Sequence, residues 1–189
     1  MTTIEDLHRR VEQLEHRFEI AQLISAYAVA CDEHDLPRLR SLFAPDAVLD
    51  SPSGLLKAQG ADAIVEMFVR LFKIRGPGYH WTHDHFLHFD AGHPDRASGT
   101  VLSHAETCPN GVASLAAMRY QDDYVRLNGR WVFAKRVLSF LYYLPVTEYK
   151  QALTSPLRVT IGDRKLPADI PESLKSWQDF LNEHGPSHS

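Results

Sequence analysis

Histidine is concentrated in one short stretch of this chain. The sequence has 11 histidines, and six of them fall within 25 consecutive residues. Imidazole is the side chain best suited to exchange protons near neutral pH, and it is also the commonest metal ligand. The stretch therefore points to acid–base chemistry or to a metal site. Its members are His80, His83, His85, His88, His93 and His104.

The segment 79–89 is predicted to be a β-strand, whose side chains alternate between two faces. Strict alternation places His80 and Phe86 on one face, and Trp81 and His83 on the other. His80 and His83 cannot both reach one cavity unless a β-bulge interrupts the strand. The strand therefore divides the histidines into two sets with different surroundings.

A metal site is one interpretation of this strand. His83 and His85 share a strand face, and a cupin-type barrel uses such a pair together with a nearby glutamate and a further histidine. Here Asp90 is the only nearby acid, and the long N-terminal helix does not suit that fold. We therefore expect no metal and no cofactor. A metalloenzyme that uses His83, His85 and His104 is kept as an alternative.

Acid–base catalysis is the second interpretation, and it needs a proton acceptor, a group that orients it and an apolar pocket. Asp32 ends a long apolar helical stretch, directly after Cys31. Its carboxylate is either solvated at the helix end or turned toward the sheet. Tyr27, five residues earlier, lies on the apolar stripe of the same helix. Asp32 and a histidine are thus candidates for the orienting group and the acceptor.

Two later strands also carry polar side chains. His104 and Glu106 share one face of the predicted strand 97–107. Arg136, with Lys135 beside it, interrupts an apolar strand near residue 135. Such a cation either extends its charged end to solvent or lies in a pocket and stabilises negative charge.

Four further residues are predicted to have structural roles. Asp122 and Asp123 are expected on an outward or edge face of the sheet. Cys31 and Cys108 are expected to be small buried residues, because two cysteines without a CxxC spacing form neither a disulfide framework nor a metal motif.

Composition limits the class of protein. The chain has 189 residues, 44% of them hydrophobic, and a formal net charge of −4. This is typical of a single globular domain and argues against a nucleic-acid or anionic-membrane surface. No apolar run is long enough to span a bilayer, and the first residues lack the pattern of a signal peptide. We expect a cytoplasmic protein.

Helical patterns come first and strand patterns follow, which is typical of an α+β fold. Asn128-Gly129 is the strongest hairpin signal, because both residues accept the positive φ of a type I′ turn. The predicted helices span about 3–31, 36–43 and 61–72, the strands about 47–50, 79–90, 97–107, 113–127 and 131–143, and two short tail helices about 146–153 and 171–183.

Several short motifs together resemble the SnoaL-like branch of the nuclear transport factor 2-like superfamily, over residues of about 8–143. In chain order they are Ile24-x-x-Tyr27-Ala-x-Ala-Cys-Asp32-x-x-Asp35-x-x-x-Leu39, Leu42-Phe-Ala-Pro-Asp-Ala47, Gly60-x-x-Ala-Ile64, a histidine before the first long strand, Asp95-Arg-Ala-Ser-Gly99, and Tyr120-x-Asp-x-Tyr124 followed by Asn128-Gly-Arg-Trp131.

The resemblance implies a fold and an assembly. A cone-shaped, curved antiparallel sheet wraps around a long N-terminal helix and two shorter helices. The domain is expected to span residues 1–144, and residues 145–189 form an extension that packs on the domain or on a neighbouring subunit. Because relatives form homodimers or homotrimers, we expect one of these states here.

The resemblance also implies a site, through bile acid 7α-dehydratase, scytalone dehydratase and hexachlorocyclohexane dehydrochlorinase. By position, His80 matches the catalytic base, with His83 as its competitor, and Asp32 matches the aspartate that orients it and raises its pKa. Tyr27 matches the helix tyrosine of the dehydratases, and His104 or Glu106 matches a further polar group. Arg136, or Lys135 beside it, matches a pocket base. The expected substrate-binding residues are His83, Trp81, Phe68, Phe72, Phe86 and Met118.

These residues predict a cofactor-independent dehydratase or isomerase. Its partner would be a small hydrophobic, cyclic substrate of the steroid, polyketide or terpenoid type. A non-catalytic module of the same fold, which binds a small apolar molecule, is the alternative from another class.

Overall fold

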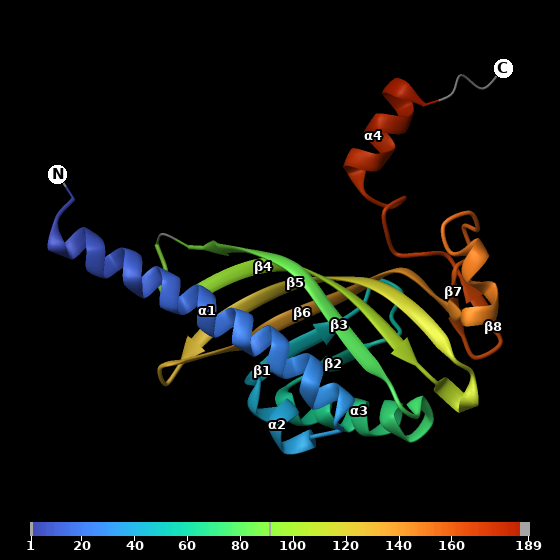
Figure 1. Ribbon diagram of the computed structural model, residues 1–189, viewed down its shortest axis with the longest axis horizontal. Helices are drawn as coiled ribbons and strands as arrows, with labels where there is room; N and C mark the ends of the chain where they lie inside the picture. Colours follow the sequence, from blue (N-terminus) through green and yellow to red (C-terminus); the bar gives the residue numbers. More distant parts are fainter. Residues whose placement is uncertain (1, 91, 186–189) are drawn as a thin grey trace.

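The computed structural model describes residues 2–90 and 92–185 and shows an α+β fold with a curved, unclosed sheet (Figure 1). Three helices within the first 75 residues pack against one side of the sheet, and the long strands follow them, as the sequence predicts (Figure 1). They are α1 (Ile4–Asp32), α2 (Leu36–Ser41) and α3 (Ala61–Arg75). The expected fold class is thereby confirmed.

The long helix α1 begins at a capping box, in which the side chains of Thr3 and Asp6 each bind the backbone N–H of the other residue. In its second half, one side of the helix is buried in the core through residues such as Ile20 and Tyr27. Its first half lies in solvent. The helix ends at Asp32, which brings that carboxylate to the start of the third strand.

Six strands form the main path of the sheet in the order β2-β1-β6-β5-β4-β3, and β7 and β8 extend it beyond β6. Most neighbours are antiparallel, but β1 and β7 each run parallel to β6. The sheet is therefore mixed rather than wholly antiparallel. Its strands are β1 (Phe43–Asp50), β2 (Lys57–Gln59), β3 (Tyr79–Phe89), β4 (Arg96–Thr107), β5 (Ser114–Leu127), β6 (Arg130–Pro145), β7 (Val159–Ile161) and β8 (Arg164–Leu166).

The hairpin between β5 and β6 forms at the predicted place. Asn128 and Gly129 have φ values of 50° and 76°, and Leu127 pairs with Arg130 across the turn. The second predicted helix is shorter than expected at its C-terminal end. Phe43 begins β1 because it pairs with Phe133 of β6.

A β-bulge in β3 overturns the expectation of strict alternation. The pairing of β3 with β4 shifts by one residue between Thr82 and His85. A one-residue shift moves the side chains that follow to the opposite face. Leu87 is consequently buried, whereas Phe86 is exposed on the outer face.

The segment after residue 145 forms the short 3₁₀ helix η2 (Val146–Gln151), the β7–β8 hairpin and α4 (Lys175–His184). The predicted first tail helix is thus a 3₁₀ segment, and the second begins four residues later than expected. Arg158 anchors the tail through hydrogen bonds to the carbonyl of Leu141 on β6 and to Glu172. Residues 186–189 of the expected extension, and residues 1 and 91, lie outside the described residues.

None of the described helices combines the length and the apolar character needed to cross a membrane.

Candidate active site

Asp32 and His80 are joined by two hydrogen bonds. The Asp32 Oδ1 atom lies 2.6 Å from Nδ1 of the imidazole, and Oδ2 accepts the backbone N–H of His80 at 2.9 Å. Both side chains are largely buried. The carboxylate therefore fixes the position of the strand and the orientation of the ring, and it leaves Nε2 as the ring nitrogen that is not bound to Asp32.

The position of Asp32 explains why this pair forms. A carboxylate at the C-terminal end of a helix is disfavoured by the helix dipole, and α1 has no basic residue in its last turn to offset it. The N–H groups of His80 provide that compensation from the first residues of β3. The dyad thus joins the end of the longest helix to the beginning of a strand.

The pKa values of the two groups both shift downward. Burial alone would raise the pKa of Asp32, but hydrogen bonds from the ring and backbone of His80 outweigh it. Burial lowers the pKa of His80; Asp32 opposes this effect, and the positive charge of Arg75 adds to it. Asp32 raises the pKa of His80, as expected, but burial and Arg75 outweigh it, so the expected net rise is wrong. His80 is held neutral, as a general base requires.

Arg75, the last residue of α3, contacts the imidazole of His80 from the other side. Its Nη2 atom lies 3.2 Å from Nε2 and 3.4 Å from Nδ1. One atom at such similar distances from both ring nitrogens must lie over the face of the ring, because a position in the ring plane would clash with the carbon between them. The guanidinium therefore directs an N–H at the face of the His80 ring, and Nε2 keeps its in-plane lone pair.

A Gly-Pro-Gly turn positions Arg75. A Cβ atom on Gly78 would lie 3.2 Å from Nε of Arg75 and 3.0 Å from the carbonyl oxygen of Glu106. Gly76 has a φ of 62° and passes close to Cys108, whose N–H binds the carbonyl of Arg75. Only glycine leaves room for this close approach of helix end and strand.

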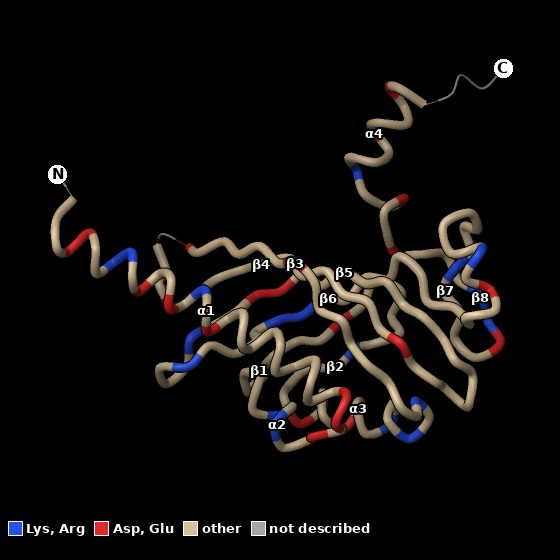
Figure 2. Tube along the Cα trace, in the orientation of Figure 1, with Lys and Arg blue, Asp and Glu red and all other residues tan. Residues whose placement is uncertain are grey.

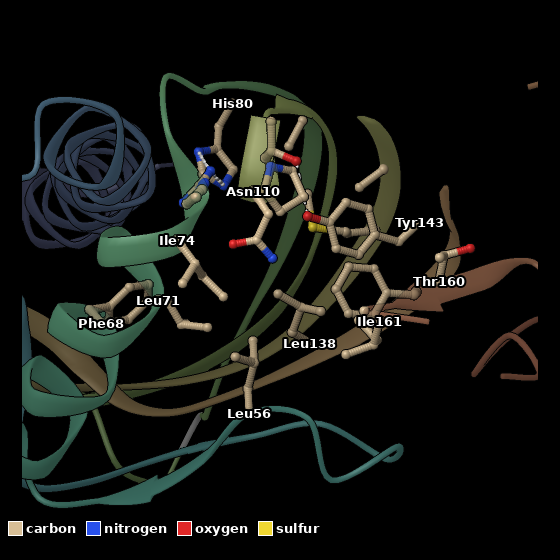
Figure 3. Close-up of a pocket in the computed structure, with 18 of the residues that line it drawn as sticks. Leu56, Phe68, Leu71, Ile74, His80, Asn110, Leu138, Tyr143, Thr160 and Ile161 are labelled. Atoms are coloured by element: carbon tan, nitrogen blue, oxygen red, sulfur yellow. Dashed lines mark hydrogen bonds between the residues drawn. The ribbon is translucent and has the colours of Figure 1, made fainter. Parts of the chain in front are cut away.

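A cavity of about 220 Å³ opens beside the dyad (Figure 3). His80 and Arg75 lie at one side, and Asn110 points into it from a turn between β4 and β5. Thr160 and Ile161 of β7 form part of the opposite wall, so the tail completes the pocket. Most of the remaining wall is apolar and includes Leu56, Phe68, Leu71, Ile74, Met118 and Leu138.

Tyr27 lines the cavity and packs on a buried cation. The Arg136 guanidinium lies 4.2 Å from the centre of the Tyr27 ring, and its Nε and Nη2 atoms bind the two oxygens of Asp122 at 2.8 and 2.7 Å. Burial raises the pKa of Tyr27 well above 10.0, so its hydroxyl stays protonated and can donate a hydrogen bond.

The sequence model of the SnoaL-like domain matches residues 12–137, which is two thirds of the chain. The chain belongs to the SnoaL-like domain family. Among the curated proteins no significant match is found.

Solved structures share the fold of this SnoaL-like protein. Hexachlorocyclohexane dehydrochlorinase type 3 from Novosphingobium barchaimii LL02 is 21% identical, with a TM-score of 0.67 over 72% of this chain and 94% of that one. A candidate scytalone dehydratase from Novosphingobium aromaticivorans DSM 12444 is 17% identical, with a TM-score of 0.66 over 81% and 97%. A candidate aromatic ring hydroxylase from the same organism is 25% identical, with a TM-score of 0.65 over 71% and 96%.

Within this SnoaL-like domain, the structure brings only some of the predicted site residues together. The side chains of Asp32 and His80 form the dyad, and Tyr27, Phe68 and Met118 join His80 at the cavity. Arg136 neither reaches solvent nor lines the cavity, because the buried carboxylate of Asp122 holds it beneath Tyr27. The prediction that Asp122 lies on an outward or edge face is therefore wrong.

Other predicted residues lie on the outer face of the sheet. His83 Nε2 and His104 Nδ1 are 2.8 Å apart there, and Trp81 and Glu106 line the same shallow hollow. Side chains at alternate positions of β4 point away from the core, so the sheet separates His104 from the dyad. His104 therefore cannot act together with Tyr27 in one pocket.

Two predicted pocket walls lie elsewhere. Phe86 is exposed on the outer face as a result of the bulge. Phe72 stacks on His34, with the ring centres 4.1 Å apart, and does not line the cavity. The helical period places Phe72 on the side of α3 that faces the end of α1.

The alternative metal site is not assembled. His85 pairs with Val101, whose side chain is buried in the core, so it lies on the opposite face from His83 and His104. Within residues 2–90 and 92–185, no group of three or more histidine, cysteine, aspartate or glutamate side chains is placed to hold a metal ion.

Sequence reasoning missed three residues of the site: Arg75, Asn110 and Tyr143. Basic residues are common in the last turn of a helix, so Arg75 alone gave no functional signal. The Gly-Pro-Gly that follows it does indicate close packing. Asn110 has a positive φ of 51° in an Asn-Gly turn, and that dipeptide was a usable signal. Tyr143, whose hydroxyl hydrogen-bonds Thr107 at 3.0 Å, lies beyond the part of β6 that the motifs cover.

Proposed function

We propose that this SnoaL-like protein is a cofactor-independent lyase or isomerase that removes a proton from a carbon next to a carbonyl group. The observation that carries the proposal is the Asp32–His80 dyad at the edge of a mostly apolar cavity. An apolar binding pocket alone does not need a buried carboxylate that fixes one ring nitrogen of a histidine. A general base does, because its tautomer and direction must be set.

In the proposed first step, His80 carries its proton on Nδ1, bound to Asp32, and its Nε2 lone pair accepts the proton from carbon. The C–H bond breaks, and its electron pair moves through the carbon–carbon bond to the carbonyl oxygen, which gives an enolate. Asp32 then stabilises the imidazolium that has formed. No further oxidant or reductant is required.

Arg75 and Tyr27 are the proposed partners of the enolate oxygen. Arg75 places a positive charge over the ring of His80 and has no carboxylate partner within 4.0 Å among the described residues. Preorganised donors of this kind stabilise developing negative charge in a water-poor site. Arg75 thus takes the role that the sequence had assigned to His104.

In the second step, the enolate electrons re-form the carbonyl. A hydroxyl on the β carbon leaves as water after it receives a proton from the His80 imidazolium, which completes a dehydration. When the substrate is instead a β,γ-unsaturated ketone, the enolate is a dienolate that accepts the same proton at its γ carbon, and the double bond moves into conjugation with the re-formed carbonyl, which completes an isomerisation.

The cavity indicates the size of the substrate. A pocket of about 150 Å³ lined by aliphatic and aromatic side chains is sufficient for benzene. The present cavity, at about 220 Å³ and open at its mouth, fits a substituted single ring with further substituents in solvent. We propose a small, mostly apolar cyclic ketone or β-hydroxy ketone as the substrate class.

The test uses two probes. In D₂O, NMR spectroscopy follows exchange of the α-protons of α-tetralone, and ultraviolet absorbance follows loss of water from a β-hydroxy cyclohexanone. We expect catalysed exchange or dehydration that His80→Gln abolishes. The control His88→Gln changes an exposed histidine of the same strand and should retain the rate. Binding of the ketone without exchange would instead assign the protein as a non-catalytic binding module.

A further inference from the structure

The first half of α1 exposes a continuous apolar stripe. Five large side chains along it are between 48% and 73% exposed, and this part of the helix extends past the body of the domain (Figure 1). Single exposed apolar residues are ordinary, but a row along one helix face indicates a contact surface. The stripe consists of Ile4, Leu7, Val11, Leu14 and Phe18.

The spacing of the stripe is that of a coiled coil. Its members follow one another at intervals of three, four, three and four residues, which is a repeat of 3.5. This repeat places Ile4, Val11 and Phe18 at heptad position a, and Leu7 and Leu14 at position d. Such a seam packs against a second helix with the same seam, as knobs into holes. A helix that packs on a globular core carries a broader apolar face instead.

The domain itself leaves this seam free. Its own core contacts come from His16, Ile20 and Leu23, at heptad positions f and c, which lie on the side of the helix opposite a and d. A second helix can therefore lie along the stripe without displacing the sheet. Because α1 continues into the folded domain and begins at a capping box, the helix is already nucleated and requires only a partner.

We propose that the stripe binds the same stripe of a second copy of this chain, as a parallel two-stranded coiled coil. The flanking charges favour this partner and this direction. Arg10 occupies position g and Glu15 the following position e, and these two positions face each other between parallel helices. Antiparallel helices would instead bring position g against g, where Arg10 and Arg17 repel. Figure 2 shows acidic and basic residues alternating along this part of α1.

Sedimentation velocity over a range of protein concentrations tests the contact. The full chain is expected to form a dimer, and Leu14→Glu is expected to dissociate it, since a charge at a d position must be buried in the seam. The matched control is Leu153→Glu, which changes an even more exposed leucine of the tail and should leave the dimer intact. A monomeric wild-type chain, or a dimer that resists Leu14→Glu, overturns the proposal.

A charge exchange tests the pairing. Arg10→Glu turns two attractive contacts of the symmetric dimer into repulsive ones, which should weaken dimerisation by about tenfold. Adding Glu15→Arg restores attraction and should recover most of the affinity. Failure of the second substitution to recover affinity contradicts the proposed pairing of position g with position e.

Disulfide trapping tests the direction. In a Cys108→Ser background, Leu14→Cys puts the two thiols face to face at position d of a parallel dimer, and mild oxidation should give a covalent dimer. Circular dichroism and thermal unfolding of each variant show that the domain stays folded. If the Leu14→Cys variant dimerises but mild oxidation forms no disulfide between the two chains, the helices are antiparallel and the parallel arrangement is refuted.

Discussion

The Arg75 guanidinium directs an N–H at the face of the His80 imidazole, while Asp32 binds the edge of the same ring. A cation and an anion therefore act on one base from different directions. Asp32 favours the protonated ring, whereas burial and Arg75 disfavour it, and burial is the largest influence. The Arg75 charge lowers the proton affinity of His80 but supplies a partner for negative charge next to Nε2.

This opposition predicts a measurable shift of the His80 pKa. Arg75→Gln removes the positive charge and should raise the pKa of His80, whereas Arg75→Lys should leave it low. Histidine titration by NMR spectroscopy measures the pKa of His80 in both variants. An unchanged His80 pKa in Arg75→Gln would show that the charge of Arg75 has no electrostatic effect on this base.

The pH dependence of the proposed reaction follows from the same shift. His80 acts as a base only when neutral, and its pKa lies below the ordinary 6.5, so kcat/KM should rise along a limb below pH 6.5 and then level off. The limb should move to higher pH in Arg75→Gln.

The neutral state of His80 also affects the pH dependence of folding stability. Below pH 6.5 the unfolded histidine binds a proton that the folded one resists, so this contribution to stability is present at higher pH and lost on acidification.

Asp32→Asn separates orientation from charge. The amide has nearly the same shape, so the fold should persist, but it no longer stabilises the imidazolium and can favour the wrong tautomer. We expect the rate of proton exchange to fall by roughly two to four orders of magnitude. Ketone affinity, measured by titration, should change little. A full rate in Asp32→Asn would remove this carboxylate from the mechanism.

Much of the fold could be predicted from local patterns. The helix of α1, the switch from helical to strand periodicity near residue 78 and the Asn128-Gly129 turn are all encoded within a few residues. The same holds for Asp32 and His80, because helix end and strand start are local features that the family resemblance places together.

The features of the structure that differ from the sequence-based predictions depend on contacts between residues far apart in the chain. The bulge after Thr82 is fixed by pairing with β4, and it decides that Phe86 faces outward. Arg136 and Asp122 meet only because β5 and β6 are in register, where they are cross-strand partners. Neither strand alone carries a signal for that pairing, so the sequence pattern predicted Asp122 to be a surface residue.

The two cysteines should differ in reactivity. Burial raises the pKa of the Cys31 thiol to about 12, so almost no thiolate is present at neutral pH. Cys108 lies at a turn and is partly exposed. In the native protein, a thiol reagent such as Ellman's should therefore modify Cys108 and spare Cys31, and both should react in denaturant. Rapid native labelling of Cys31 would mean that the core beside α1 opens readily.

The ion pair beneath the cavity gives the sharpest stability prediction. Among the described residues, Arg136→Met leaves the buried Asp122 carboxylate with only the Tyr124 hydroxyl as a side-chain partner, and losing one member of a buried pair costs about 3–5 kcal/mol. Adding Asp122→Asn removes the uncompensated charge, so the double variant should be more stable than Arg136→Met alone. Urea unfolding followed by circular dichroism measures each free energy.

The control for this comparison is Arg40→Met, which breaks the exposed pair with Asp62 and should not change stability measurably. If Asp122→Asn instead destabilises Arg136→Met further, the carboxylate must have partners that outweigh the loss of the guanidinium. The buried pair then contributes to folding chiefly through Asp122, and Arg136 serves mainly to support the ring of Tyr27, which it contacts face-on and which lines the cavity.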